Sequence, residues 1–93
     1  MKITDVEAII VKQPSEIEMI GDGSQDTVVI LVHTDEGITG IGEVDSSPYA
    51  VKTVIDMPDS HMVCRGLKEV IIGEDAFDVE KIWRKMYEMS LYH

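Results

Sequence analysis

The first half of the chain carries apolar residues in short runs that are typical of β-strands. The run KITDVEAIIVKQ (2–13) is rich in β-branched residues, which favour extended backbone. The run TVVILVHTD (27–35) is apolar at successive positions and predicts a central strand that is covered on both faces. A turn at DEG leads into ITGIGEVD (38–45), which predicts a third strand. Together the three runs predict an antiparallel meander.

The second half changes to the helical period of about 3.6 residues. The stretch SSPYAVKTVIDMP (46–58) begins with Ser47 as a candidate N-cap and Pro48 at the first helical position. Pro58 marks its end. Its apolar stripe consists of Ala50, Val51, Val54 and Ile55.

Two further helical stretches complete the chain. MVCRGLKEVIIG (62–73) predicts a helix, or two short ones, with Gly73 at the C-terminal end. EDAFDVEKIWRKMYEMSLYH (74–93) predicts a last helix capped by Asp75 or Asp78 and carrying no stop signal. The residues predicted to be buried are Leu67, Val70 and Ile71 in the first stretch, and Val79, Ile82, Trp83, Met86 and Met89 in the second.

The order β-β-β-α-α-α predicts an α+β fold. Strands followed by helices are typical of a three-stranded antiparallel sheet with about three helices packed on one face. The apolar character of the last residues predicts that the domain is incomplete at His93, and that apolar side chains of the last helix lack partners. Because such side chains favour association, the sequence also predicts a homo-oligomer.

The glycines of HTDEGITGIGEV (33–44) do not predict a phosphate-binding loop. Their order is G-x-x-G-x-G, and strand residues rather than a helix follow them. We expect Gly37 to supply a positive φ in the hairpin turn. Gly40 and Gly42 are expected to thin one face of the third strand, for a bulge or for close packing.

Charge and cysteine content exclude several classes of function. The formal net charge of −10 argues against a nucleic-acid surface and against an anionic membrane face. No apolar run approaches the length of a transmembrane helix. The single cysteine, Cys64, and an N-terminus without a secretory pattern predict a cytoplasmic protein. The histidines lack the spacing of a zinc site, so the sequence does not support one.

One long segment, PSEIEMIGDGSQD (14–26), predicts a loop. It places Ile17, Met19 and Ile20 among acidic residues, so these apolar side chains need a surface to cover. That surface is either the domain's own sheet or a pocket over which the loop lies as a lid.

Several stretches in order resemble one enzyme family. They are MKITDVEAIIV, TVVILVHTDEGITGIGEV, SPYAV and LKEVIIGEDAFDVEKIWRKMY. This pattern resembles the N-terminal capping domain of the mandelate racemase and muconate lactonizing enzyme family, within the enolase superfamily. The resemblance implies an enolase N-terminal domain-like fold over residues 1–93 and a C-terminal (β/α) barrel of about 250 residues that is absent from this chain.

The resemblance also implies a chemistry for the parent enzyme. Such enzymes remove a proton α to a carboxylate, with a Lys or His base and a Mg²⁺ ion that stabilises the enediolate. The parent would be an isomerase (racemase) or a lyase (acid-sugar dehydratase) acting on a small carboxylate or acid sugar. The base and the metal ligands belong to the barrel, so the resemblance assigns none of them to this chain.

Two loops of the capping domain are implied to contact substrate. By position they are 15–25, with Glu18, Met19 and Ile20 facing the substrate, and 45–47, with Ser46. A closed lid strengthens electrostatic interactions and fixes substrate choice. The alternatives are a stand-alone acidic α+β interaction module without catalytic activity, and a small structural or oligomerising protein without a ligand.

Overall fold

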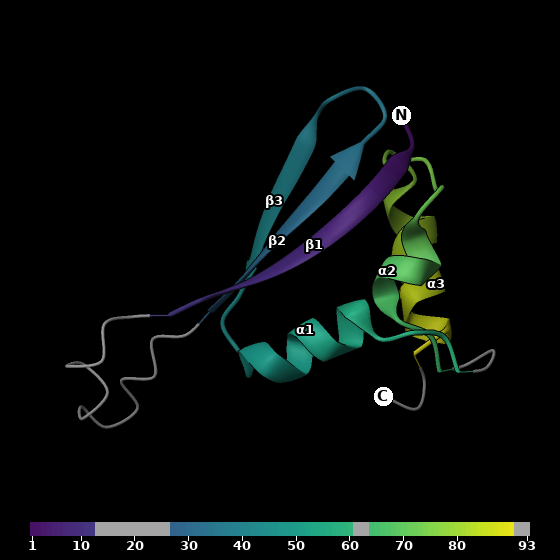
Figure 1. Ribbon diagram of the computed structural model, residues 1–93. Coiled ribbons are helices and arrows are strands. Elements are labelled where there is room, and N and C mark those ends of the chain that lie inside the picture. Colours follow the sequence, from purple (N-terminus) through teal and green to yellow (C-terminus); the bar gives the residue numbers. More distant parts are fainter. Residues whose placement is uncertain (13–26, 61–63, 91–93) are drawn as a thin grey trace, which may run out of the picture.

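The computed structural model describes residues 1–12, 27–60 and 64–90 (Figure 1). Strands come first and helices follow, which confirms the predicted α+β order. The strands are β1 (Ile3–Val11), β2 (Thr27–Thr34) and β3 (Thr39–Val44). The helices are α1 (Pro48–Asp56), α2 (Leu67–Ile71) and α3 (Val79–Glu88).

The three strands form one antiparallel sheet in the order β1-β2-β3, so β2 is central as predicted. The register places Ala8 opposite Ile30 and Ile30 opposite Gly42. Because side chains alternate between the two faces of a strand, these three positions share one face. All three helices lie on one side of the sheet (Figure 1).

The core lies between this face and the helices. Val28 is fully buried at the start of β2, and Val6 and Ala8 are buried on β1. Helix α1 packs on β1 and β2, and α2 packs on β1. The complete buried cluster consists of Ile3, Val6, Ala8, Val28, Ile55, Val70, Ile71 and Ile82.

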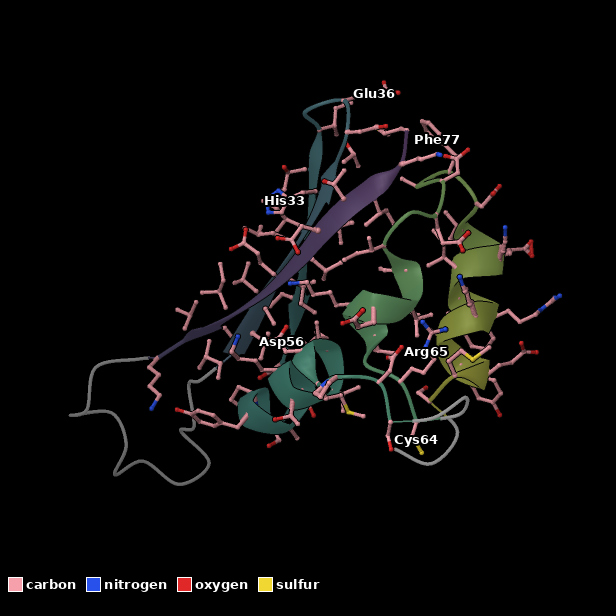
Figure 2. All side chains as sticks on the ribbon, turned by 45° about the vertical axis from the view of Figure 1, so that its right-hand side comes forward. His33, Glu36, Asp56, Cys64, Arg65 and Phe77 are labelled. Atoms are coloured by element: carbon pink, nitrogen blue, oxygen red, sulfur yellow. The ribbon has the colours of Figure 1, made fainter. Side chains whose placement is uncertain are left out.

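The other face of the sheet corrects one prediction. We expected β2 to be covered on both faces, yet within the described ranges no helix lies on the second one. Leu31 is half-buried there, and Ile41 is 77% exposed. His33 projects from this face (Figure 2) and bridges the strands through Glu7 Oε1 and Thr39 Oγ1.

The glycines of the hairpin behave differently from one another. Gly37 has a φ of 81° in the turn, which confirms its predicted role. The bulge considered for Gly40 and Gly42 is wrong, since the register between β2 and β3 is continuous. Close packing is not found there either, because a Cβ at Gly40 or Gly42 would have no heavy atom within 4 Å in the described structure.

Helix α1 begins and ends close to its predicted limits. Pro48 occupies the first turn, and the Val51 N–H donates to the Ser47 carbonyl at 3.0 Å. Ser47 thus starts the helix through its backbone, although its side chain forms no capping hydrogen bond. Ile55 is buried as predicted, whereas Ala50 is exposed, because the helix turns that position away from the sheet.

A close approach at Gly66 joins α1 to α2. A Cβ on Gly66 would lie 2.0 Å from the Met57 carbonyl oxygen and 3.3 Å from the Ile55 carbonyl oxygen. The Asp59 carboxylate accepts hydrogen bonds from the Gly66 N–H at 3.2 Å and from Arg65 Nε at 2.8 Å. No local sequence pattern indicates Gly66, because its role depends on this contact with the end of α1.

Helix α2 is shorter than predicted, and its end matches the prediction. It begins after Gly66, so residues 64–66 are not helical. Val70 and Ile71 are buried, and Gly73 follows the helix with a φ of 92°.

The predicted buried face of α3 is partly wrong. Ile82 is buried and Met86 half-buried, but Val79 is 69% exposed and Trp83 is 61% exposed. The reason is that α3 packs chiefly against α2, which covers only one side of its apolar arc. The helix also ends at Glu88 instead of continuing toward the end of the chain.

Two groups of ion pairs stabilise the packing of the helices, one within the helical layer and one between β1 and α2. Glu74 pairs with Lys85 and with Lys81, and these ammonium groups, Lys85 first, hold the pKa of the Glu74 carboxyl below its usual range. Asp5 on β1 pairs with Lys68 of α2 at 2.9 Å. That hydrogen-bonded contact lowers the pKa of Asp5 and raises the pKa of Lys68.

Candidate functional site

The candidate site lies at the end of the sheet where β1 ends, β2 begins and β3 ends. Val11 pairs with Thr27, and Val28 pairs with Val44. Lys12, Thr27 and residues 45–47 therefore lie at this same end, at the lower left of Figure 1. Lys12 and Thr27, the described residues that flank the predicted contact segment 15–25 in the sequence, therefore lie at the same end of the sheet as the second predicted segment, 45–47.

Thr27 connects the strands at this end. Its hydroxyl donates to the Val44 carbonyl at 2.9 Å, and it also lies 3.3 Å from Glu43 Oε2. The hydroxyl thus ties the first residue of β2 to the last residues of β3. This contact fixes the point from which residues 45–47 leave the sheet.

Of the four predicted contact residues, Ser46 lies within the described ranges. It is exposed in the connection between β3 and α1, so its hydroxyl is accessible from solvent. Glu18, Met19 and Ile20 lie outside the described residues.

Helix α1 adds cationic and aromatic groups that the sequence analysis missed. Lys12 Nζ lies 5.3 Å from the centre of the Tyr49 ring, within the range of a cation–π contact. Lys52 Nζ donates to the Ala8 carbonyl at 2.8 Å and pairs with Asp56 at 2.8 Å. These contacts join β1 to α1 across more than thirty residues of sequence, and no local pattern indicates them.

The described part of the site is an open surface. Throughout residues 1–12, 27–60 and 64–90, every polar or charged residue is at least partly exposed. In the same ranges, no three His, Cys, Asp or Glu side chains gather closely enough to hold a metal ion. Such a surface can contact a bound molecule from one side, through hydrogen bonds and apolar contacts.

None of the helices in the described ranges is long and apolar enough to cross a membrane.

The fold and the site together define an α+β capping domain of the enolase type, a three-stranded antiparallel sheet with helices on one face. The full chain, residues 1–93, matches the family model described as mandelate racemase / muconate lactonizing enzyme, N-terminal domain. The chain therefore belongs to this family, which confirms the resemblance found in the sequence.

Solved structures support the same assignment. A protein from Rhodobacter sphaeroides, described as a predicted mandelate racemase, superimposes with a TM-score of 0.83 at 28% identity, covering 97% of this chain and 23% of its own. The muconate lactonizing enzyme from Pseudomonas putida matches with a TM-score of 0.73 at 25% identity, covering 97% and 24%.

A third structure contains a metal ion. It is a mandelate racemase/muconate lactonizing enzyme from a marine actinobacterium in complex with magnesium. It matches with a TM-score of 0.72 at 25% identity, covering 97% of this chain and 22% of its own. The present chain thus spans less than a quarter of the length of each of these three proteins.

Proposed function

We propose that this chain is the lid-forming part of an enolase-superfamily enzyme whose catalytic groups lie in a (β/α) barrel beyond residues 1–93. The parent enzyme would remove a proton α to a carboxylate and act as a racemase or as an acid-sugar dehydratase. The family match over the entire chain supports this proposal, as does the small share that the chain covers of the related structures.

The observation that carries the proposal is the common origin of two segments. Val11, Thr27 and Val44 lie at one end of the sheet, and in the sequence these strand ends flank both segments that are predicted to contact substrate. Two loops that leave a rigid sheet from one end can close over the same substrate, and closure excludes water from the reacting groups.

Each candidate residue has a role that follows from its side chain. The Ser46 hydroxyl would donate a hydrogen bond to a substrate carboxylate or hydroxyl oxygen. The Glu18 carboxylate would be repelled by the substrate's own carboxylate. It would therefore accept hydrogen bonds from the hydroxyl groups of a sugar acid. Met19 and Ile20 would cover apolar parts of the substrate and exclude water.

In this proposal, magnesium would bind to the barrel of the parent enzyme and not to residues 1–93. A relative in the family is described with magnesium, and the described residues of this chain offer no ligand set for it. The resemblance to the family is what places the metal ligands in the barrel, so the proposal assigns no metal-dependent step to this chain. A cytoplasmic location stays a prediction that rests on the lone cysteine.

The proposal is tested by substituting Ser46→Ala in the protein expressed from the whole reading frame. A hydrogen bond to a charged group contributes about 1.5–3 kcal/mol, so we expect kcat/KM on a responsive carboxylate or acid sugar to fall by about 10-fold or more. Ser60→Ala is the matched control, since Ser60 is also exposed and lies beyond α1. Equal kcat/KM values for the two variants would refute the proposed contact between Ser46 and the substrate.

The runner-up is a stand-alone acidic interaction module, which the exposed apolar side chains favour. Ile41 on the sheet and Trp83 on α3 are both more than half exposed. This alternative predicts that the reading frame ends at His93 and that the chain has no activity on any carboxylate substrate.

A further inference from the structure

Lys12 and Tyr49 form a contact at the end of the sheet where the candidate site lies. Lys12 directly follows β1, and Tyr49 lies in the first turn of α1. Lys12 Nζ is 5.3 Å from the centre of the Tyr49 ring, where the ammonium group is attracted by the electron-rich face of the ring. The Tyr49 side chain is 55% exposed and does not belong to the core cluster, so core packing does little to fix its position.

The start of α1 has no side-chain cap, so its position depends on other contacts. The Ser47 side chain forms no capping hydrogen bond, and Pro48 has no N–H to donate. Farther along the helix, Lys52 Nζ donates to a backbone carbonyl of β1 at 2.8 Å. The contact between Lys12 and Tyr49 holds the first turn itself against the end of β1.

Ser46 lies in the middle of the three-residue connection between β3 and α1. On the sheet side of this connection, the Thr27 hydroxyl donates to the Val44 carbonyl at 2.9 Å. On the helix side, the Val51 N–H donates to the Ser47 carbonyl at 3.0 Å, so Ser47 moves with the first turn of α1. Because three extended residues reach at most about 11 Å, a shift of that first turn relative to the sheet also moves the Ser46 hydroxyl.

We propose that Lys12 and Tyr49 are positioning residues for the reaction of the parent enzyme. Their contact holds the first turn of α1 against the end of β1, and this placement directs the Ser46 hydroxyl at the substrate. Neither Lys12 nor Tyr49 has to touch the substrate for this role. The inference rests on the proposed function, because it requires that Ser46 contacts the substrate.

The strength of the contact limits the size of the effect. A cation–π contact at an exposed site shifts an equilibrium by about two- to fivefold. Loss of the contact can therefore reduce the population in which Ser46 is correctly placed by no more than this factor. We expect kcat/KM to fall by about two- to fivefold, which is less than the loss of about 10-fold or more expected for Ser46→Ala.

Steady-state kinetics on the protein expressed from the whole reading frame test the proposal, with a panel of acid sugars and mandelate as substrates. Lys12→Met and Tyr49→Leu should each lower kcat/KM by about two- to fivefold. Tyr49→Phe should retain the activity because it keeps the ring, and Lys12→Arg should retain it because it keeps the positive charge. Lys81→Met is the matched control and should leave kcat/KM unchanged. It removes the same charge from α3, which lies away from this end of the sheet (Figure 1).

The same substitutions in a Ser46→Ala background separate positioning from a direct effect of the lysine charge on an anionic substrate. Attraction between Lys12 and the substrate would persist without the Ser46 hydroxyl, whereas a positioning effect is lost together with that hydroxyl. We therefore expect Lys12→Met and Tyr49→Leu to have no further effect on kcat/KM in this background. Lys12 and Tyr49 are both exposed, and far-UV circular dichroism verifies that each variant is folded.

Three results would overturn the inference and leave the proposed function intact. The first is an unchanged kcat/KM for Lys12→Met in a protein in which Ser46→Ala lowers it. The second is a loss of the same size for Lys12→Met with and without the Ser46 hydroxyl. The third is an equal loss for Tyr49→Phe and Tyr49→Leu, because the phenol hydroxyl and not the ring would then carry the effect. A whole protein that is inactive on the entire panel would contradict both the inference and the proposed function.

Discussion

Substitution of Gly66 by alanine should destabilise the chain through a clash with backbone. The added Cβ would lie 2.0 Å from the Met57 carbonyl oxygen and 3.0 Å from the Met57 carbonyl carbon, where ordinary contacts are 3.4–4 Å. Because both atoms belong to the backbone at the end of α1, no side-chain rotation relieves the clash. The junction between α1 and α2 must move by more than 1 Å, which also strains the hydrogen bond from the Gly66 N–H to Asp59.

The expected loss follows from two opposing terms. Overpacking typically costs about 1–3 kcal/mol and sometimes more, and a backbone clash belongs at the upper end. Replacing Gly by Ala also reduces the entropy of the unfolded chain, which stabilises by about 0.4–1 kcal/mol. The φ of Gly66 is −68°, so alanine adds no dihedral strain. We therefore expect a net loss of about 2–3 kcal/mol, a large part of the stability of a domain of this size.

Urea unfolding followed by far-UV circular dichroism measures this loss. Gly42→Ala is the matched control, because a Cβ there meets no atom within 4 Å and the residue lies in a strand. Alanine in a strand interior is favoured over glycine by about 0.5–1 kcal/mol, so the control should be neutral or slightly more stable. If the midpoint of Gly66→Ala matched that of Gly42→Ala, the close contact with Met57 would be refuted.

The remaining predictions concern acid stability and the two sides of α3. Lys85 and Lys81 lower the pKa of Glu74 in the folded chain. The Glu74 ion pairs therefore stabilise the fold fully at pH values above the ordinary Glu pKa of about 4.3. This stabilisation is lost as the pH falls through the lowered pKa of the folded state. Glu74→Gln should flatten this acid limb of a stability-versus-pH curve, and an unchanged limb would contradict the assignment. Ile82→Ala should cost about 2–5 kcal/mol in urea unfolding, because Ile82 is buried. Val79→Ala should cost less than about 0.5 kcal/mol, because Val79 is exposed, and similar losses for the two variants would contradict the observed orientation of α3.

Local patterns predicted the elements of this fold well. The β-branched runs identified the three strands within two residues of their ends, and Pro48 marked the start of α1. Gly37 was predicted to have a positive φ and has one. These features depend on a residue and its close neighbours in the chain, and sequence reasoning is sound at that range.

The misses all involve contacts between distant parts of the chain. The apolar period of α3 predicts an apolar arc but not how much of it a neighbouring helix covers, so Val79 and Trp83 were wrongly predicted to be buried. Similarly, the apolar run of β2 suggested two covered faces, and the described helices cover one. Gly66 owes its importance to a carbonyl nine residues earlier, at Met57, which no local pattern indicates.

For the candidate site too, some features were predicted from the sequence and others were not. The sequence identified the segment containing Ser46 through a family resemblance, and the structure places Ser46 on an exposed connection at the end of the sheet. The contact between Lys12 and Tyr49 at the same end could not be predicted, because it joins the residue that follows β1 to the first turn of α1. The roles of Glu18, Met19 and Ile20 stay predictions.

The most direct test of the proposed function is to read the coding sequence beyond His93. The account predicts an open reading frame that continues for about 250 residues or more, with a Lys or His base and three acidic metal ligands at the ends of barrel strands. A stop codon directly after His93 would contradict the assignment of this chain as the lid of an enzyme active site.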